Sequence, residues 1–233
     1  MPTPPPTLEL KDVQFRWPGR APFELSVPKL ALAPAETVLL LGESGSGKST
    51  LLSLICGTIT AQSGRVAVAG TDISSLSAGK RDRFRAEQIG LIFQQFNLLP
   101  FANVRDNILL PLRFAPDRAA RVSDPETEAE TLCRALGLPN NVMNEQAGKL
   151  SVGQQQRVAA ARALIGAPPL IIADEPTSSL DAATQSAFLE LLFSQSRAHR
   201  STVLMVSHDA RLSDQFDRVI HMDDVAQTDR NAA

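Results

Sequence analysis

The chain has 233 residues, with 43% hydrophobic and 21% charged content, which is typical of a folded protein with one substantial core. Its formal net charge of -2 gives no electrostatic basis for binding nucleic acid, and we expect no nucleic-acid partner. No apolar run approaches the roughly 20 residues that span a bilayer, so a partner must bring the protein to any membrane at which it works. The two cysteines, Cys56 and Cys133, lack C-x-x-C spacing and indicate reduced residues of a cytosolic protein.

The N-terminal region predicts a short lead followed by strands. Residues 1–7 lack the basic and apolar regions of a signal peptide and are expected to be disordered. Alternating apolar and polar residues predict a strand over residues 8–15. A turn at Pro18-Gly19 and further short strands at residues 23–27 and 30–32 are expected to follow.

The most specific motif is Gly-Glu-Ser-Gly-Ser-Gly-Lys-Ser at residues 42–49, which fits G-x-x-x-x-G-K-[ST]. It lies between a predicted buried strand, residues 37–41, and a predicted helix, residues 50–56, which is the context that binds phosphate. Lys48 is expected to neutralise the β- and γ-phosphates, and the Ser49 hydroxyl to hold Mg²⁺. The alternative, a flexible Gly/Ser turn, does not require Lys-Ser at its end. The residues expected to bind nucleotide here are Gly42, Ser44, Gly45, Ser46, Gly47, Lys48, Ser49 and Thr50.

The remaining elements alternate between short apolar runs and helical patterns. Asp124-Pro125-Glu126 is a good helix start within a helical region from residue 104 to about residue 137. The other expected elements are strands at 64–70, 89–93, 170–173, 202–206 and, as a candidate, 219–222, and helices at 151–165 and 181–198. Apolar β-branched runs separated by helices predict a largely parallel sheet covered by helices.

Two acidic residues, Asp174 and Glu175, follow the buried strand at residues 170–173. Ligands of α/β sheets gather outside the carboxyl ends of strands. Asp174 can hold Mg²⁺ through its water shell, and Glu175 can polarise the water that attacks the γ-phosphate. The alternative is a solvated Asp-Glu pair opening a turn before Pro176, and the phosphate loop upstream favours the functional interpretation.

Further motifs complete a set that resembles the ABC ATPase family. Leu-Ser-Val-Gly-Gln-Gln-Gln-Arg at residues 150–157 resembles the L-S-G-G-Q signature of that family, and Gln94 resembles its Q-loop. Residues 179–181, Ser-Leu-Asp, resemble the D-loop, and His208 resembles the switch histidine. Trp17 falls where the family has an aromatic residue that stacks on adenine.

The resemblance covers about residues 8–224 and implies both a fold and cofactors. The implied fold is α/β: a P-loop NTPase core with a largely parallel sheet, an N-terminal antiparallel β subdomain and an α-helical signature subdomain at about residues 95–160. A polar tail at residues 225–233 would follow. The implied cofactors are ATP and Mg²⁺, with Gln94 as a further Mg²⁺ ligand at the hinge to the helical subdomain. The residues expected to act in catalysis are Glu175, His208, Gln94 and Lys48, and those expected to hold the metal are Ser49, Gln94 and Asp174.

In this family the signature meets the phosphate loop only in a head-to-tail dimer, so a second copy of the chain is the first expected partner. Ser151 and the Gly153 N–H would contact the γ-phosphate bound by that copy. Val152 replaces the first glycine of the signature, and a β-branched residue there resists positive φ and close backbone approach. Ala35-Glu36 replaces the usual Gly-Glu, which we expect to be harmless in a turn. Two more residues expected at the shared nucleotide site are Gln154 and Asp181.

Residues 81–93, 95–100 and 106–112 resemble ATPases of the lipoprotein-releasing, macrolide-export and cell-division class. The resemblance implies a peripheral subunit on the cytoplasmic face of the inner membrane, which drives a separate permease with a large periplasmic domain. The permease is expected to contact apolar residues between 96 and 101, and to export or extract a lipid, lipoprotein or hydrophobic compound.

Three alternatives stay open at this point. The first is an importer ATPase for amino acids, which carries a similar Q-loop neighbourhood. The second is a regulatory ATPase that drives a cell-envelope partner without transport. The third is a soluble ABC ATPase of DNA repair or translation, although such proteins usually carry an inserted coiled coil or tandem nucleotide domains, neither of which this sequence shows.

Overall fold

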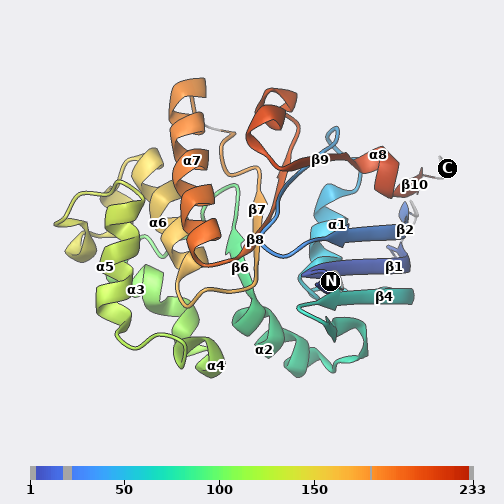
Figure 1. Ribbon diagram of the computed structural model, residues 1–233, viewed down its shortest axis with the longest axis horizontal. Helices are drawn as coiled ribbons and strands as arrows, with labels where there is room; N and C mark the ends of the chain where they lie inside the picture. The colour runs from blue at the N-terminus through green and yellow to red at the C-terminus, as the bar shows by residue number, and fades with distance from the viewer. Residues whose placement is uncertain (1–3, 18–22, 179, 231–233) are drawn as a thin grey trace.

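Two β sheets organise the chain, which the computed structural model describes over residues 4–17, 23–178 and 180–230 (Figure 1). Four sequence-based expectations fall outside these ranges in whole or in part. They are the start of the lead at residues 1–3, the turn at Pro18-Gly19, Ser179 of the D-loop segment, and the end of the polar tail at residues 231–233.

The first sheet is antiparallel, with strand order β10-β2-β1-β4-β5. The predicted strands at residues 23–27 and 30–32 are one continuous strand, β2. Lys29 of β2 pairs with Lys11 of β1, and Val27 pairs with Val13, but Pro28 between them is unpaired. The N–H that proline lacks is therefore not needed for a hydrogen bond between these strands. The bounds are β1 (Leu8–Arg16), β2 (Phe23–Leu32), β4 (Ser63–Val68), β5 (Thr71–Asp72) and β10 (Gln227–Arg230).

The second sheet is parallel, with strand order β6-β7-β8-β3-β9. Every residue of β3 and of β8 is buried, as expected for strands covered on both faces. The bounds are β3 (Thr37–Leu41), β6 (Ile89–Ile92), β7 (Leu170–Asp174), β8 (Thr202–Ser207) and β9 (Arg218–His221). The predicted α/β fold, with a parallel sheet and an antiparallel sheet, is confirmed.

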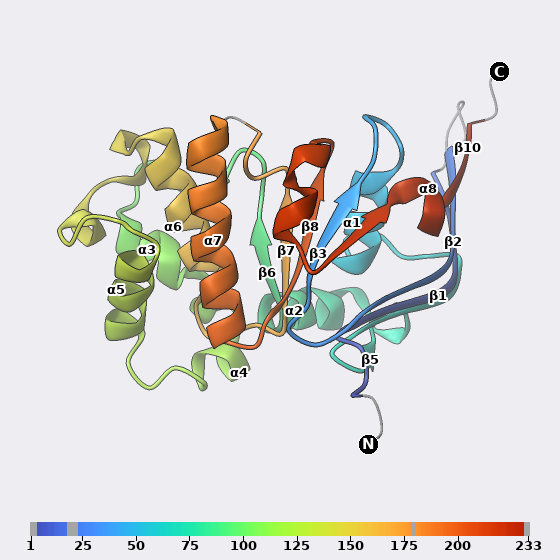
Figure 2. The same cartoon turned by 45° about the horizontal axis from the view of Figure 1, so that its top comes forward.

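Helices cover the parallel sheet on both faces (Figures 1 and 2). The helix start predicted at Asp124 is present, because its carboxylate accepts hydrogen bonds from the N–H groups of Glu126 and Thr127. The α-helices are α1 (Lys48–Ile55), α2 (Ala78–Gln88), α3 (Val104–Leu109), α4 (Pro116–Ala119), α5 (Pro125–Ala135), α6 (Val152–Leu164), α7 (Ala182–Ala198) and α8 (Met222–Val225). The 3₁₀ turns are η1 (Ile73–Ser75), η2 (Leu110–Arg113), η3 (Val142–Asn144), η4 (Ala147–Lys149) and η5 (Ala210–Gln215).

The parallel sheet separates two apolar cores, because successive residues of each strand point to opposite faces. Leu39 and Ile171 pack with α3, α5, α6 and α7 in the helical core. Leu40 and Ile172 pack with α1 and the antiparallel sheet in the other core. Helices α1 and α6 therefore lie on opposite faces of the same sheet (Figure 2).

Residues from the predicted disordered lead, 1–7, and from the predicted polar tail, 225–233, are hydrogen-bonded to the antiparallel sheet. Thr7 is buried; its N–H donates to the Leu32 carbonyl at 2.9 Å, and its own carbonyl accepts from the Ala69 N–H at 2.7 Å. Thr228, expected in the polar tail, pairs with Leu25 of β2. An edge strand gains its stability from backbone pairing, so it needs no run of apolar side chains to reveal it in the sequence.

The turn before β3 contains a strained alanine. Ala35, expected to be harmless, has a φ of 60° in the left-handed region. In the folded protein, a left-handed backbone costs an alanine roughly 1–2 kcal/mol that a glycine does not pay. A glycine also makes the unfolded chain more flexible, which lowers stability by only roughly 0.4–1 kcal/mol. We therefore expect Ala35→Gly to raise the free energy of unfolding, by up to about 1 kcal/mol, in urea denaturation. Ala31→Gly, in the regular strand β2, is the control and should lower stability; equal destabilisation by both changes would contradict this reading.

Candidate functional site

Four loops that carry candidate residues leave the same edge of the parallel sheet. They follow β6, β7, β8 and β3, which are consecutive neighbours in the strand order. Gln94 follows β6, Glu175 follows β7, His208 follows β8 and the phosphate loop follows β3. The topology thus brings together segments that are more than 100 residues apart in the chain.

The phosphate loop is closed by its own lysine. Nζ of Lys48 donates to the carbonyl oxygens of Gly42 at 2.6 Å and of Glu43 at 2.7 Å, and the side chain is 8% exposed. Gly45 and Gly47 have φ values of 81° and 100°. A Cβ at position 47 would lie 3.0 Å from the Phe23 ring, so conformation and space both require glycine there.

Polar groups of this loop fit an oxygen-rich anion. The Ser46 hydroxyl is buried and has no hydrogen-bond partner among the described residues. No side chain in the described part of the chain caps the N-terminus of α1. The first N–H groups of a helix have no acceptor within the helix, and the helix dipole favours negative charge at this end. The residues present therefore suit the phosphates of a nucleotide.

Trp17 lies against the start of α1 and is not part of the core. Its Nε1 donates to the Thr50 hydroxyl at 3.2 Å, and its ring meets Phe15 edge-on, with centroids 5.0 Å apart. The side chain is 42% exposed. One edge of the indole is fixed beside the phosphate loop, so a planar base could stack on the ring.

Asp174 is the last residue of β7, and Glu175 directly follows it. Burial and the neighbouring Glu175 raise the pKa of Asp174, and Lys48 opposes this by lowering it. A bound cation would favour the ionised form of Asp174. Magnesium is usually held by one or two carboxylates plus substrate phosphates, so the site fits Mg²⁺ together with a nucleotide.

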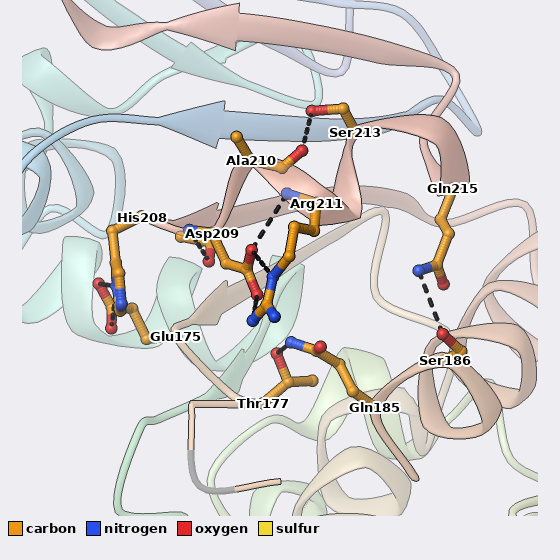
Figure 3. A network of polar contacts seen from close by, with 11 residues as sticks. Glu175, Thr177, Gln185, Ser186, His208, Asp209, Ala210, Arg211, Ser213 and Gln215 are labelled. Carbon is orange, nitrogen blue, oxygen red and sulfur yellow. Dashed lines mark hydrogen bonds and ion pairs between the residues drawn. The ribbon is translucent and has the colours of Figure 1, made fainter. Parts of the chain in front are cut away.

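Glu175 is held against His208. The His208 Nδ1 lies 3.0 Å from both carboxylate oxygens of Glu175 (Figure 3). The Glu175 backbone has a φ of 42°, and its N–H donates to the Val206 carbonyl at 3.0 Å. Asp209 pairs instead with Arg211, which lowers the pKa of Asp209 to about 2. The carboxylate at His208 is therefore that of Glu175.

The segment after Gln94 is anchored by a residue that was not predicted. Gln94 is exposed, and the two residues Phe96 and Asn97 have left-handed φ values of 58° and 48°. The guanidinium of Arg162, on α6, donates to their carbonyl oxygens at 2.5 and 2.7 Å. Burial lowers the pKa of Arg162. The sequence signal of this role is a charged residue among the apolar residues 158–164 of α6, all of which are buried.

The signature residues form the start of α6. The Ser151 hydroxyl accepts from the Gln154 N–H at 3.3 Å, and the Gln154 side-chain oxygen accepts from the Ser151 N–H at 3.0 Å, a capping box. Val152 is the first helical residue, has no positive φ and is 51% exposed. A β-branched side chain is therefore compatible with the backbone here, because this helix start requires no positive φ at Val152. A Cβ at Gly153 would meet nothing within 4 Å.

Asp181 has the equivalent place at the start of α7. Its carboxylate accepts from the Thr184 N–H at 3.0 Å and from the Thr184 hydroxyl at 2.8 Å, and these bonds lower the pKa of Asp181.

No helix in the described part of the chain is long and apolar enough to cross a membrane.

Comparison with known proteins gives a consistent family. Residues 25–178 match the family model described as ABC transporter. The uncharacterized ABC transporter ATP-binding protein YbbA of Escherichia coli K12 is 38% identical over 207 residues, which cover 88% of this chain and 89% of that protein. The lipoprotein-releasing system ATP-binding protein LolD of Anaeromyxobacter dehalogenans is 41% identical over 222 residues, which cover 94% and 91%.

A longer relative and a solved structure agree with these matches. The macrolide export ATP-binding/permease protein MacB of Rhodopirellula baltica is 40% identical over 84% of this chain, which corresponds to 28% of that protein. A dimeric, post-hydrolysis structure of the ATP-binding cassette MJ0796 with ADP and Pi has a TM-score of 0.79 and 31% identity, and the match covers 97% of this chain and 99% of that one. The chain therefore belongs to the ABC transporter family, as an ATP-binding and ATP-hydrolysing subunit.

Proposed function

We propose that the chain hydrolyses Mg-ATP at the edge of the parallel sheet, in a head-to-tail dimer, and drives a separate permease that exports or extracts a lipid, lipoprotein or other hydrophobic compound. The observation that carries the hydrolysis site is the fixed Glu175–His208 pair, in the loops after β7 and β8, at the same edge of the sheet as the phosphate loop that Lys48 closes. A carboxylate so placed can accept a proton from the water that attacks the γ-phosphate.

The other residues of the site bind and orient the nucleotide. Lys48 exchanges the carbonyls of Gly42 and Glu43 for the β- and γ-phosphates, and the Ser46 hydroxyl and the α1 N–H groups donate to the same phosphates. Trp17 stacks on the adenine, and His208 donates a hydrogen bond to the γ-phosphate. When bound, Mg²⁺ neutralises phosphate charge; the residues that would hold it are Ser49, Gln94 and Asp174.

A dimer is supported by the separation of two nucleotide-binding elements within one chain. The phosphate loop leads into α1, whereas Ser151 and Gly153 start α6, on the opposite face of the sheet. A Cβ at Gly153 would have open space, so that helix start is free to receive another molecule. MJ0796, at 31% identity, is dimeric with ADP and Pi. We propose that Gln154 and Asp181 face the same shared nucleotide.

Val152→Gly tests whether the departure from the signature limits turnover. Because Val152 has a helical backbone and an exposed side chain, glycine should change the ATPase rate of the dimer less than about tenfold, equivalent to 1.4 kcal/mol in the barrier. It should also slightly destabilise the start of α6. Steady-state hydrolysis of both proteins at matched concentration measures this. A tenfold or larger increase would show that the valine hinders the approach of the partner.

We propose that the permease contacts a groove beside residues 96–101 rather than the apolar residues of that segment. Phe96 is buried and Leu98 is partly buried against the helical core, so both side chains contribute to that core. A cavity of about 720 Å³ lies between α2, β6 and α4. Phe93 and Phe114 line it, and Phe114 is 66% exposed. The groove suits an amphipathic helix of a membrane protein.

The proposed cargo rests on the names of two relatives, the lipoprotein-releasing ATP-binding protein LolD and the macrolide export protein MacB. Attachment to such a permease would hold the chain on the cytoplasmic face of the inner membrane. An importer or a regulatory partner would require a different membrane protein, so the identity of the bound permease separates these alternatives.

Phe114→Asp tests the groove. Co-expressed with a candidate permease, the variant should lose co-purification with membranes and keep its basal ATPase rate, because the groove is separate from the nucleotide site. Gln14→Asp, which adds the same charge on the exposed side of β1, is the matched control. If Phe101→Asp abolishes association and Phe114→Asp does not, the contact lies on the 76% exposed Phe101 instead.

A further inference from the structure

Two buried glutamines contact the turn that follows Glu175. The Gln156 Nε2, on α6, donates to the Pro176 carbonyl at 2.9 Å. The Gln185 Nε2, on α7, donates to the Thr177 hydroxyl at 2.8 Å; Figure 3 shows this contact in the same view as the Glu175–His208 pair. Gln156 is fully buried and Gln185 is 7% exposed. Two helices thus hold consecutive residues of one turn.

The turn needs support from its surroundings. Glu175 has a φ of 42°, which is unfavourable for a residue with a Cβ and persists only where packing and hydrogen bonds fix it. Within the turn, the Ser178 N–H donates to the Glu175 carbonyl at 3.3 Å and the Leu180 N–H to the Thr177 carbonyl at 3.1 Å. The two glutamine side chains add the contacts that tie this turn to α6 and α7.

The amide of Gln156 is not explained by stability alone. Its Oε1 is buried and has no hydrogen-bond partner in the described part of the chain. Such an orphaned acceptor is destabilising, and an apolar side chain of similar size would avoid it. The amide is present despite this cost, and the hydrogen bond that it makes is the one to the Pro176 carbonyl.

We propose that Gln156 and Gln185 are positioning residues for ATP hydrolysis, a role that rests on the proposed function of Glu175. By fixing Pro176 and Thr177 they hold the backbone of Glu175, and with it the carboxylate, at His208. The same two helices begin at Ser151 and Asp181, so the two helix starts proposed to face the shared nucleotide are rigidly connected to the catalytic carboxylate.

The test uses near-isosteric changes at the contact itself. Thr177→Val removes the acceptor of Gln185 and preserves volume, Thr177→Ser keeps the hydroxyl, and Gln156→Met removes the amide. We expect Thr177→Val and Gln156→Met to lower kcat by about ten- to a hundredfold, as displaced catalytic groups do. KM for ATP should stay within about twofold of wild type, and Thr177→Ser should restore most of kcat. Gln195→Ala, elsewhere on α7, is the control and should leave kcat unchanged.

Two further variants complete the test. Adding Gln185→Leu to Thr177→Val should lower kcat no further, because both changes break one contact. Unchanged kcat in Thr177→Val and in Gln156→Met, or a loss confined to KM or to the melting temperature, would overturn the positioning role. Glu175→Gln is measured in parallel: if that variant still hydrolyses ATP, the proposed role of Glu175 has failed, whereas an inactive Glu175→Gln beside fully active Thr177→Val and Gln156→Met refutes the glutamine contacts alone.

Discussion

Replacing Glu175 with glutamine should abolish ATP turnover while leaving ATP binding intact. The carboxamide has nearly the same shape as the carboxylate, and its oxygen can still accept from His208, 3.0 Å away in the native protein. It cannot accept a proton from the attacking water, however. Loss of a general base lowers rates by about 10²–10⁴-fold. The phosphate loop and Trp17 are untouched, so nucleotide affinity should be preserved.

The variant should accumulate as an ATP-bound dimer, because hydrolysis is the step that would separate the copies. Size-exclusion chromatography with Mg-ATP measures this shift, and phosphate release measures turnover. Glu190→Gln, at an exposed position of α7, is the matched control and should behave as wild type. Hydrolysis at near wild-type rate would remove Glu175 from the catalytic role and leave His208 without its proposed partner in the reaction.

The parts of the fold and site that the sequence predicted are those with local signals. The phosphate loop has a fixed motif with two glycines at left-handed φ, and strands β3, β7 and β8 are short apolar runs. Once those strands are parallel, topology alone places Glu175 and His208 at one edge. The contact between these two side chains is thus a consequence of strand order.

The parts that the sequence did not predict depend on partners distant in the chain. Helix α2 was not predicted, because among its residues only Glu87 is buried and the helix has no apolar stripe. Strand β10 is formed by pairing with β2. The bonds from Arg162 to residues 96 and 97, and from Gln185 to Thr177, join positions whose neighbourhood only the folded chain creates.

Replacing Lys48 with alanine should remove most of the nucleotide affinity. Lys48 is almost fully buried and its ammonium group already makes two hydrogen bonds to loop carbonyls, so it is held where the phosphates would bind. A hydrogen bond to a charged group is worth about 1.5–3 kcal/mol, so affinity should fall about tenfold or more. Calorimetric titration with Mg-ATP measures the change, and Lys80→Ala, on exposed α2, is the control.

A second consequence follows from the position of Lys48 beside Asp174. Lys48 is the cation that lowers the pKa of Asp174 against the effects of burial and of Glu175. Without it the pKa of Asp174 rises further, so the carboxylate becomes protonated at a higher pH and is lost as a candidate Mg²⁺ ligand sooner as the pH falls. Residual Mg-ATP affinity of Lys48→Ala should therefore begin to decline at a higher pH than that of the wild type. Equal affinities would show that Lys48 does not hold the phosphates, and a decline that begins at the same pH in the two proteins would show that Lys48 does not act on Asp174.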